Sequence, residues 1–178
     1  VPNLECYCFG FMKNGKSIFS GWHDGKIRSF LPQSGKLLFC INEAHINGVT
    51  AITSSSDCRK IVSGGMNGEI RVWKISPYEQ KMEASLKEHR GRVWNLVINS
   101  RNDRAFSASA DGSCIEWDIV NYTRVACLFE TTMFKQLVYH PDESQILTTG
   151  TDKKITYWDV IDSNEIRSID GSYDGEIN

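Results

Sequence analysis

A short polar residue, Asp or Asn, precedes a large aromatic residue by six positions at four places along this 178-residue chain. The four pairs are Asp24 and Phe30, Asn67 and Trp73, Asp111 and Trp117, and Asp152 and Trp158. Successive aromatics follow one another after 43, 44 and 41 residues. A nearly constant period of this length indicates one structural unit that is repeated four times. We therefore expect an array of similar units rather than a fold around one central core.

Further columns come into register when the four copies are aligned on the polar residue. A small hydroxyl residue lies four positions before it, at Ser20, Ser63, Ser107 and Thr148. An apolar residue lies eighteen positions before it, at Cys6, Val49, Val93 and Phe134. Apolar and polar residues alternate between the columns, as in residues 69–73, which is typical of half-buried strands. Asp24-Gly25, Asn67-Gly68 and Asp111-Gly112 predict tight hairpin turns. Lys153 takes the glycine place in the fourth copy and predicts a looser or more strained turn.

The repeat resembles that of the WD40 family, which has a period of ~40–45 residues and a Trp-Asp ending. Trp117-Asp118 and Trp158-Asp159 match that ending. The resemblance implies an all-β fold in which each repeat is a four-stranded antiparallel blade of a β-propeller. We expect residues 1–178 to form a partial WD40 propeller, with repeats over about 1–41, 42–86, 87–129 and 130–169 and the start of a further repeat at 170–178.

Four copies are fewer than the number, commonly about seven, that closes a WD40 ring. The chain is therefore expected to be a segment of an incomplete propeller, and its start without an initiator Met agrees with a piece of a longer protein. Such a segment has open blade edges, which further blades or another chain would cover.

Composition excludes several classes of function. The formal net charge is -2, and the basic residues are scattered, so no basic stripe for nucleic acid is present. No apolar run approaches the ~18 residues that a membrane span needs. The six cysteines include no Cys-x-x-Cys pair, so we expect reduced thiols, no metal site and a cytoplasmic type of compartment. No glycine-rich phosphate loop is present, and we expect no cofactor.

The polar columns raise the question of an enzyme, because His89, Ser107 and Asp111 superficially suggest a nucleophilic triad. Similar sets recur in the other copies, whereas an active site needs one assembly in one cleft. We therefore expect no catalytic residues. The resemblance to WD40 proteins implies a structural network instead, in which the Trp N–H bonds the Ser or Thr hydroxyl, which bonds His, which bonds Asp. Its members would be Ser20, Asp24, His45, Ser63, Asn67, Trp73, His89, Ser107, Asp111, Trp117, Thr148, Asp152 and Trp158, with Glu130 in the His place of the fourth copy.

Partner contact in WD40 proteins uses the narrow top face of the propeller. The columns that open onto this face are the two positions flanking the apolar column and the position before the turn Asp. The resemblance implies that Tyr7, His23, Met66, Arg92, Trp94, Met133 and Lys135 bind a partner. Arg92 and Trp94 stand out, because Arg and Trp are enriched in binding hot spots. The alternative is that Trp94 packs against a neighbouring loop while Arg92 is solvated.

A narrower resemblance is carried by the segments 24–30, 41–45, 48–52, 86–89, 139–141 and 150–155. These segments, including Phe30 in the Trp column, are similar to the later propeller of a ciliary WD-repeat family, that of cilia- and flagella-associated protein 52. The resemblance implies a non-catalytic scaffold in the axoneme of a cilium or flagellum, inside the doublet microtubule, where it contacts tubulin and neighbouring axonemal proteins. The alternative is a general WD40 adaptor or substrate receptor that binds a peptide on the top face.

Overall fold

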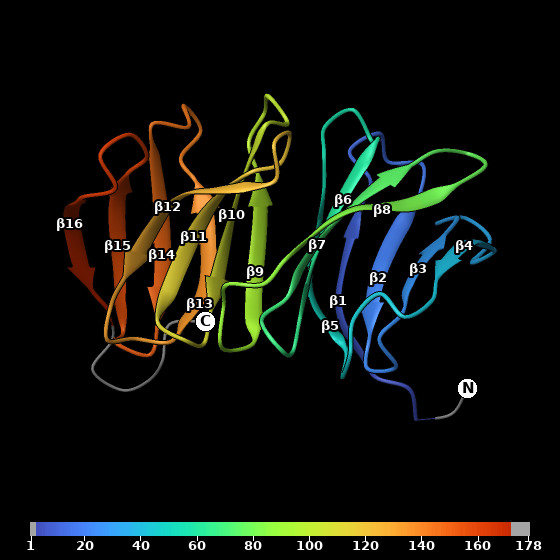
Figure 1. Cartoon of the computed structure of the whole chain (residues 1–178), viewed down its shortest axis with the longest axis horizontal. Coiled ribbons are helices and arrows are strands. Elements are labelled where there is room, and N and C mark those ends of the chain that lie inside the picture. Colours follow the sequence, from blue (N-terminus) through green and yellow to red (C-terminus); the bar gives the residue numbers. More distant parts are fainter. Residues whose placement is uncertain (1–2, 172–178) are drawn as a thin grey trace.

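The computed structural model of the chain describes residues 3–171, and these residues form only strands, turns and connecting loops. Sixteen strands build four antiparallel sheets, and each sheet uses four strands that follow one another in the sequence (Figure 1). Because each strand pairs with the next one along the chain, every sheet is a meander of hairpins. One repeat of the sequence therefore has enough strands for one complete sheet.

We call the sheets blades 1 to 4 and name the strands of each from the innermost outwards. Blade 1 contains β1 (Cys6–Phe11), β2 (Ile18–Trp22), β3 (Ile27–Phe30) and β4 (Leu37–Ile41). Blade 2 contains β5 (Val49–Ser54), β6 (Lys60–Gly65), β7 (Ile70–Ile75) and β8 (Gln80–Leu86). Blade 3 contains β9 (Val93–Ile98), β10 (Arg104–Ser109), β11 (Ser113–Asp118) and β12 (Thr123–Phe129). Blade 4 contains β13 (Phe134–Tyr139), β14 (Gln145–Gly150), β15 (Lys154–Asp159) and β16 (Glu165–Asp170).

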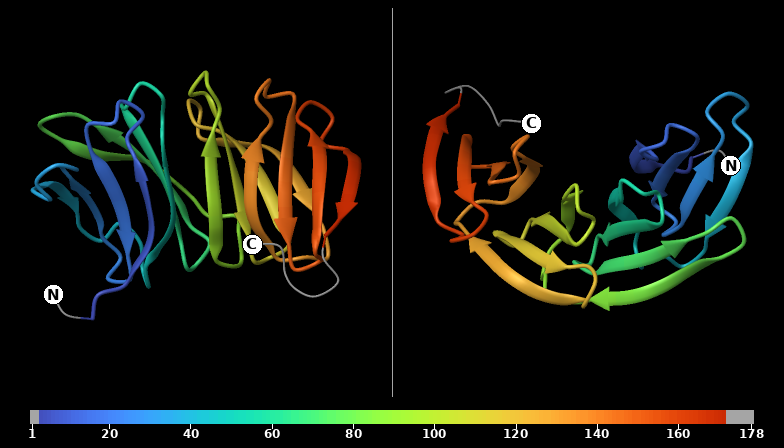
Figure 2. Two further views of the ribbon diagram at one scale, coloured as in Figure 1. Left: turned by 180° about the vertical axis from the view of Figure 1, so that it is seen from behind. Right: turned by 90° about the horizontal axis from the view of Figure 1, so that it is seen from above.

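The blades are arranged as a fan around the inner strands β1, β5, β9 and β13, which lie side by side (Figure 2). Blades 1 and 4 lie at the two ends of an open arc and do not meet. We call the end at which the inner strands begin the top face, which is at the lower edge of Figure 1, and the opposite end the bottom face. The expected architecture, an all-β segment of four antiparallel blades from an incomplete propeller, is confirmed.

Apolar side chains fill the spaces between neighbouring blades. Ile61 and Val62 are consecutive in β6, yet Ile61 packs between blades 1 and 2 and Val62 between blades 2 and 3. Ala105 and Phe106 in β10 divide in the same way between the next two spaces. Successive residues of a strand point to opposite faces, so both faces of blades 2 and 3 are buried.

The outward faces of the two end blades are different. Phe9 and Phe11 on β1 are 74% and 57% exposed, and Val138 on β13 is 55% exposed. These positions lie on strands that carry core residues elsewhere in the array, so their exposure agrees with the expected open ends. Of the expected further repeat at residues 170–178, residues 172–178 lie outside the described part of the chain.

The hairpin between the second and third strands of each blade turns through one residue of positive φ. Gly25, Gly68 and Gly112 have φ of 74°, 81° and 84°. A β-carbon on Gly25 would collide with the carbonyl oxygen of His45, so the loop to the next blade also requires glycine there. Lys153 adopts φ of 61° in blade 4. This left-handed conformation costs a residue with a β-carbon roughly 1–2 kcal/mol, so the substitution strains the turn.

Candidate functional site

Polar side chains form a closed hydrogen-bond network inside blade 3. The Trp117 Nε1–H donates to Ser107 Oγ at 2.8 Å, and His89 Nε2 lies 2.7 Å from the same oxygen. His89 Nδ1 lies 3.0 Å from Asp111 Oδ2. Ser113 donates its hydroxyl to the other carboxylate oxygen of Asp111 at 2.6 Å. The network joins the loop before β9 to β10, β11 and the hairpin between them, and the structure brings all four predicted members together.

The protonation of this network follows from its donors. Ser107 accepts the indole proton, so its own hydroxyl can donate to His89 Nε2, which leaves Nδ1–H to donate to Asp111. Burial lowers the pKa of His89, which keeps the imidazole neutral near pH 7. Burial alone would raise the pKa of Asp111, but hydrogen bonds from Ser113 and from the Arg90 amide lower it. Ser107 is fully buried, and a substrate cannot reach its hydroxyl.

Blade 2 contains the same network without its last bond. Trp73 Nε1 donates to Ser63 Oγ at 2.9 Å, and His45 Nε2 lies 2.8 Å from that oxygen. His45 Nδ1 is buried and has no hydrogen-bond partner within residues 3–171. The side-chain oxygen of Asn67 accepts from the Glu69 amide instead. Burial lowers the pKa of His45 to about 4, and the positive charge of Arg71 adds to the effect.

Blade 4 retains only the bond between Trp and the hydroxyl. Trp158 Nε1 donates to Thr148 Oγ1 at 2.8 Å. The Asp152 carboxylate accepts from the Lys154 amide at 3.4 Å, and the Asp152 amide donates to Thr132 Oγ1 at 3.1 Å. Thr132 therefore anchors the hairpin of Asp152, a role that sequence analysis did not assign to it.

Blade 1 replaces the missing indole by a different tryptophan. The side-chain ring of Phe30 has no N–H donor. Instead, Trp22 Nε1 donates to Ser20 Oγ at 2.8 Å. Asp24 forms a bidentate ion pair with Arg28, whose closest nitrogen to oxygen distance is 2.6 Å. Sequence analysis missed Trp22, although residues two apart on a strand share a face and the Ser-x-Trp spacing was therefore a usable signal.

A second group of side chains lies on the top face and joins three blades. The guanidinium carbon of Arg92 lies 3.9 Å from the centre of the Trp94 ring and 5.4 Å from that of the Tyr7 ring. Lys135 Nζ lies 5.7 Å from the Trp94 ring centre. The Tyr7 hydroxyl and His23 Nδ1 are 2.6 Å apart. We call these five residues, which come from blades 1, 3 and 4, the top-face cluster.

β-Bulges position this cluster. Register shifts in the pairing of each inner strand leave one extra residue, and these residues are Tyr7, Thr50, Trp94 and Lys135. A bulge bends its strand and redirects the side chain of the extra residue. Three of the four bulged residues belong to the top-face cluster, whereas Thr50 donates its hydroxyl to the Val93 carbonyl at 2.6 Å. The spacing along the chain indicates this column but carries no signal for the bulge.

Two hydrogen-bond donors of the cluster are left over. Trp94 Nε1 and Arg92 Nε are both buried, and neither has a hydrogen-bond partner within residues 3–171. Buried polar groups are nearly always paired, so these two donors are exceptions within the described part of the chain. Burial also lowers the pKa of Arg92, because the surroundings disfavour its charge. An anionic group beside Arg92 would compensate its charge.

The two methionines predicted for this face lie beside the cluster. Met66 is half-buried in the hairpin after β6, and Met133 is 51% exposed in the loop before β13. Both methionines add flexible apolar side chains to the top face.

The described residues offer no other chemical centre. Within residues 3–171, no three His, Cys, Asp or Glu side chains gather in a way that suits a metal ion. All six cysteines are free thiols. No helix in this part of the chain is long and apolar enough to cross a membrane.

Comparisons with known proteins concern the repeat family and the fold of this chain. The family model described as WD domain, G-beta repeat, matches residues 35–74, 80–118 and 131–159. A solved structure titled "Structure of U3-55K" superposes on the whole chain and on 55% of its own length, with a TM-score of 0.88 and 21% sequence identity. This likeness concerns the fold alone.

Curated relatives match the chain over its full length. Cilia- and flagella-associated protein 52 of Mus musculus is 49% identical, and the protein of the same name from Chlamydomonas reinhardtii is 54% identical. In both cases the match covers 100% of this chain and 29% of the relative. The chain therefore spans less than a third of the length of these relatives.

Proposed function

The chain belongs to the WD40-repeat family, and we propose that it acts as a non-catalytic scaffold in the axoneme of a cilium or flagellum. The observation that carries this proposal is the 49–54% identity over the full chain to ciliary and flagellar relatives from a mammal and an alga. Identity at this level across such distant organisms supports a shared location in the cilium or flagellum. A scaffold role also agrees with the polar residues of the blades, which form structural hydrogen bonds.

The absence of catalysis is supported by the state of the candidate nucleophile. Ser107 Oγ already accepts from Trp117 and lies 2.7 Å from His89 Nε2, and it is fully buried. A nucleophile must lie within reach of a substrate and of a base that is free to take its proton. The equivalent hydroxyls in the other blades are held by tryptophan N–H groups in the same way.

We assign partner binding to the top-face cluster with Met66 and Met133. Its partners are tubulin and neighbouring axonemal proteins, in keeping with the ciliary and flagellar names of the relatives. Arg92 and Trp94 supply an aromatic surface and a positive charge. Acidic protein surfaces fit these features, and aromatic and Arg side chains of this kind often dominate an interface.

The uncovered faces of blades 1 and 4 have a separate role in this proposal. Phe9, Phe11 and Val138 are exposed where the next blade of a closed ring would pack. We assign these faces to further blades of a complete propeller, since exposed apolar strands otherwise invite association with another chain.

A second candidate is a general adaptor that reads an extended acidic peptide on the top face. The positive charge of Arg92 beside the Trp94 ring favours it, because a carboxylate of the peptide would compensate that charge. The two candidates share a binding surface and differ in the partner.

Co-sedimentation of the full-length protein with polymerised tubulin tests the proposal. Saturable binding that Trp94→Ala weakens about tenfold supports a tubulin contact through the top face. Saturable binding that Trp94→Ala leaves unchanged would indicate that the contact lies on another surface. Absence of binding to polymerised tubulin, together with selection of acidic peptides from a peptide library, would favour the adaptor.

A further inference from the structure

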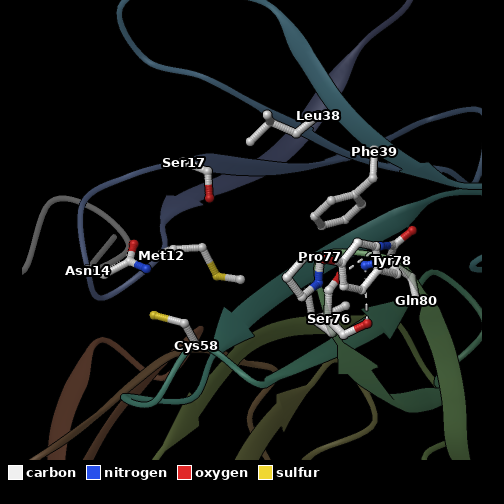
Figure 3. Close-up of a pocket in the computed structure, with 11 residues that line it drawn as sticks. Met12, Asn14, Ser17, Leu38, Phe39, Cys58, Ser76, Pro77, Tyr78 and Gln80 are labelled. Atoms are coloured by element: carbon white, nitrogen blue, oxygen red, sulfur yellow. Dashed lines mark hydrogen bonds between the residues drawn. The ribbon is translucent and has the colours of Figure 1, made fainter.

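Two grooves open on the bottom face, each between a pair of neighbouring blades. The groove between blades 1 and 2 has a volume of about 570 Å³ and is lined by Met12, Leu38, Phe39, Cys58, Pro77 and Tyr78, together with polar residues (Figure 3). The groove between blades 3 and 4 has a volume of about 420 Å³, and its lining includes Arg101, Arg104, Glu116, Asp142 and Glu143. The two grooves occupy equivalent places in the array but have different chemistry.

Apolar side chains form a large part of the lining of the first groove. Leu38 and Phe39 approach from β4, Met12 and Cys58 from two hairpins, and Pro77 from the loop before β8 (Figure 3). Tyr78 is 98% exposed and Leu38 is 46% exposed. A hollow in which apolar side chains remain open to solvent in this way is a common mark of a binding site.

Charge distinguishes the hairpins around the two grooves. The bottom hairpins of blades 1 and 2 carry four basic and two acidic residues, namely Lys13, Lys16, Lys36 and Arg59 against Asp57 and Glu79. The bottom hairpins of blades 3 and 4 carry one basic and four acidic residues, namely Arg101 against Asp103, Asp142, Glu143 and Asp162. The bottom face is therefore basic at one end of the array and acidic at the other.

Two charged residues of the second groove form ion pairs or hydrogen bonds within the molecule. Arg104 forms an ion pair with Asp118 at 2.6 Å, and Ser100 donates its amide and its hydroxyl to the Glu143 carboxylate at 2.6 and 2.9 Å. Arg104 and Glu143, which line the second groove, thus have partners in the chain itself.

The lysines around the first groove have no such partners. Lys13, Lys16 and Lys36 are exposed and form no salt bridge within residues 3–171. The nearby Asp57 carboxylate accepts from the Ser55 hydroxyl at 2.5 Å and from the Arg59 amide at 3.0 Å. The positive charges are consequently available to a binding partner.

We propose that the groove between blades 1 and 2 binds an acidic segment of another protein, which inserts one aliphatic or aromatic side chain between Leu38, Phe39 and Pro77. The apolar lining accepts the side chain, and the three lysines complement the carboxylates that flank it. This site lies on the face opposite to the top-face cluster, so the chain could hold two partners at once. The inference does not depend on tubulin as the partner of the top face.

Peptide display against the immobilised full-length protein tests the proposal. The library is first depleted on the Lys13→Glu/Lys16→Glu/Lys36→Glu variant, which removes peptides that bind elsewhere. We expect enrichment of peptides with one large apolar residue among several Asp or Glu residues. The enriched peptide is then labelled, and its affinity is measured by fluorescence anisotropy with each variant and at several salt concentrations.

The expected changes in affinity separate the two halves of the site. The triple lysine variant should bind at least about tenfold more weakly, and added salt should weaken binding to the unaltered protein, because exposed charges are screened. Leu38→Ser should weaken binding about fivefold without affecting folding, since its side chain is half exposed. Asp142→Lys at the second groove and Trp94→Ala on the top face are controls that should leave the affinity unchanged.

Three results would overturn the proposal. The first is no enrichment over the depleted library. The second is an enriched peptide that binds the triple lysine variant and the Leu38→Ser variant with the same affinity as the unaltered protein. The third is binding of a labelled 20-nucleotide DNA strand to the same lysines with the same affinity, which would assign the surface to polyanions in general. Loss of top-face binding to tubulin alone would leave this site standing.

Discussion

Trp117 and Trp94 are two tryptophans of blade 3 with opposite surroundings. Trp117 is 1% exposed and its N–H donates to Ser107 inside the blade. Trp94 is half-buried on the top face, stacks against Arg92, and has no hydrogen-bond partner for Nε1 within residues 3–171. Trp117 therefore completes a buried hydrogen-bond network, whereas we propose that Trp94 contacts a partner. Removal of the first should therefore affect stability, and removal of the second should affect binding.

The largest expected effect is on the stability of the interior network. Trp117→Phe should lower the free energy of unfolding by up to about 3 kcal/mol, because the buried Ser107 hydroxyl loses its donor and the network is left incomplete. Denaturant unfolding of the full-length protein measures the change. Trp94→Phe is the matched control and should stay within about 0.5 kcal/mol of the unaltered protein. An unchanged midpoint for Trp117→Phe would argue against a structural role for the network.

A pH titration of stability tests whether the interior histidines are held neutral. The pKa of His45 is about 4 in the folded chain, against an ordinary 6.5. Below pH 6.5 the unfolded chain takes up a proton that the folded chain does not, so stability is full above this pH and is lost as the pH falls toward 4. His45 alone should account for about 2 kcal/mol between pH 7 and pH 5, and His89, whose pKa burial also lowers, should add to the loss.

His45→Gln is the control for that titration. It removes the titrating group and should flatten the dependence of stability on pH between pH 7 and pH 5, whatever its effect on stability itself. An equally steep dependence in this variant would show that other groups cause it.

A binding measurement addresses the other side of the comparison. Arg92→Gln should weaken co-sedimentation with polymerised tubulin about tenfold, or about 1.4 kcal/mol, because it removes the charge that stacks on Trp94. Arg90→Gln is the matched control, since the Arg90 side chain is exposed and only its amide belongs to the Asp111 network. Equal losses in both variants would indicate general attraction by positive charge.

The smallest expected effect is a gain in blade 2. Asn67→Asp should supply the acceptor that His45 Nδ1 lacks and raise the free energy of unfolding by about 1 kcal/mol. The same substitution in a His45→Gln background should give no gain. A gain that persists without His45 would have to come from another partner.

Much of the fold was predictable because it depends on local patterns. The period, the alternation of apolar and polar residues and the Asp-Gly turns predicted four blades, which the structure confirms. The polar columns likewise identified His89 and Ser107 as residues that recur in step with the blades. Such features depend on spacing along one chain, and sequence records spacing directly.

Other features depend on how separate segments meet and were not predictable. The bulges that direct Tyr7 and Trp94 are shifts in strand pairing, and the same residues could in principle have been paired without them. The bottom groove forms from hairpins of two blades, so no single segment carries its signature. Trp22 makes the hydrogen bond that the Phe30 ring cannot make. To predict this bond from the sequence, one would have to know that Ser20 needs a donor.

The division of roles between Trp117 and Trp94 is tested most directly by measuring unfolding and binding to polymerised tubulin on two full-length variants, Trp117→Phe and Trp94→Ala. Each variant should change one property and leave the other unchanged. Trp117→Phe should lower the melting temperature while the folded fraction keeps its affinity, and Trp94→Ala should keep the melting temperature while its affinity falls about tenfold. A Trp94→Ala variant that lowers the melting temperature as much as Trp117→Phe does, and leaves the affinity unchanged, would show that Trp94 serves the fold and not a partner.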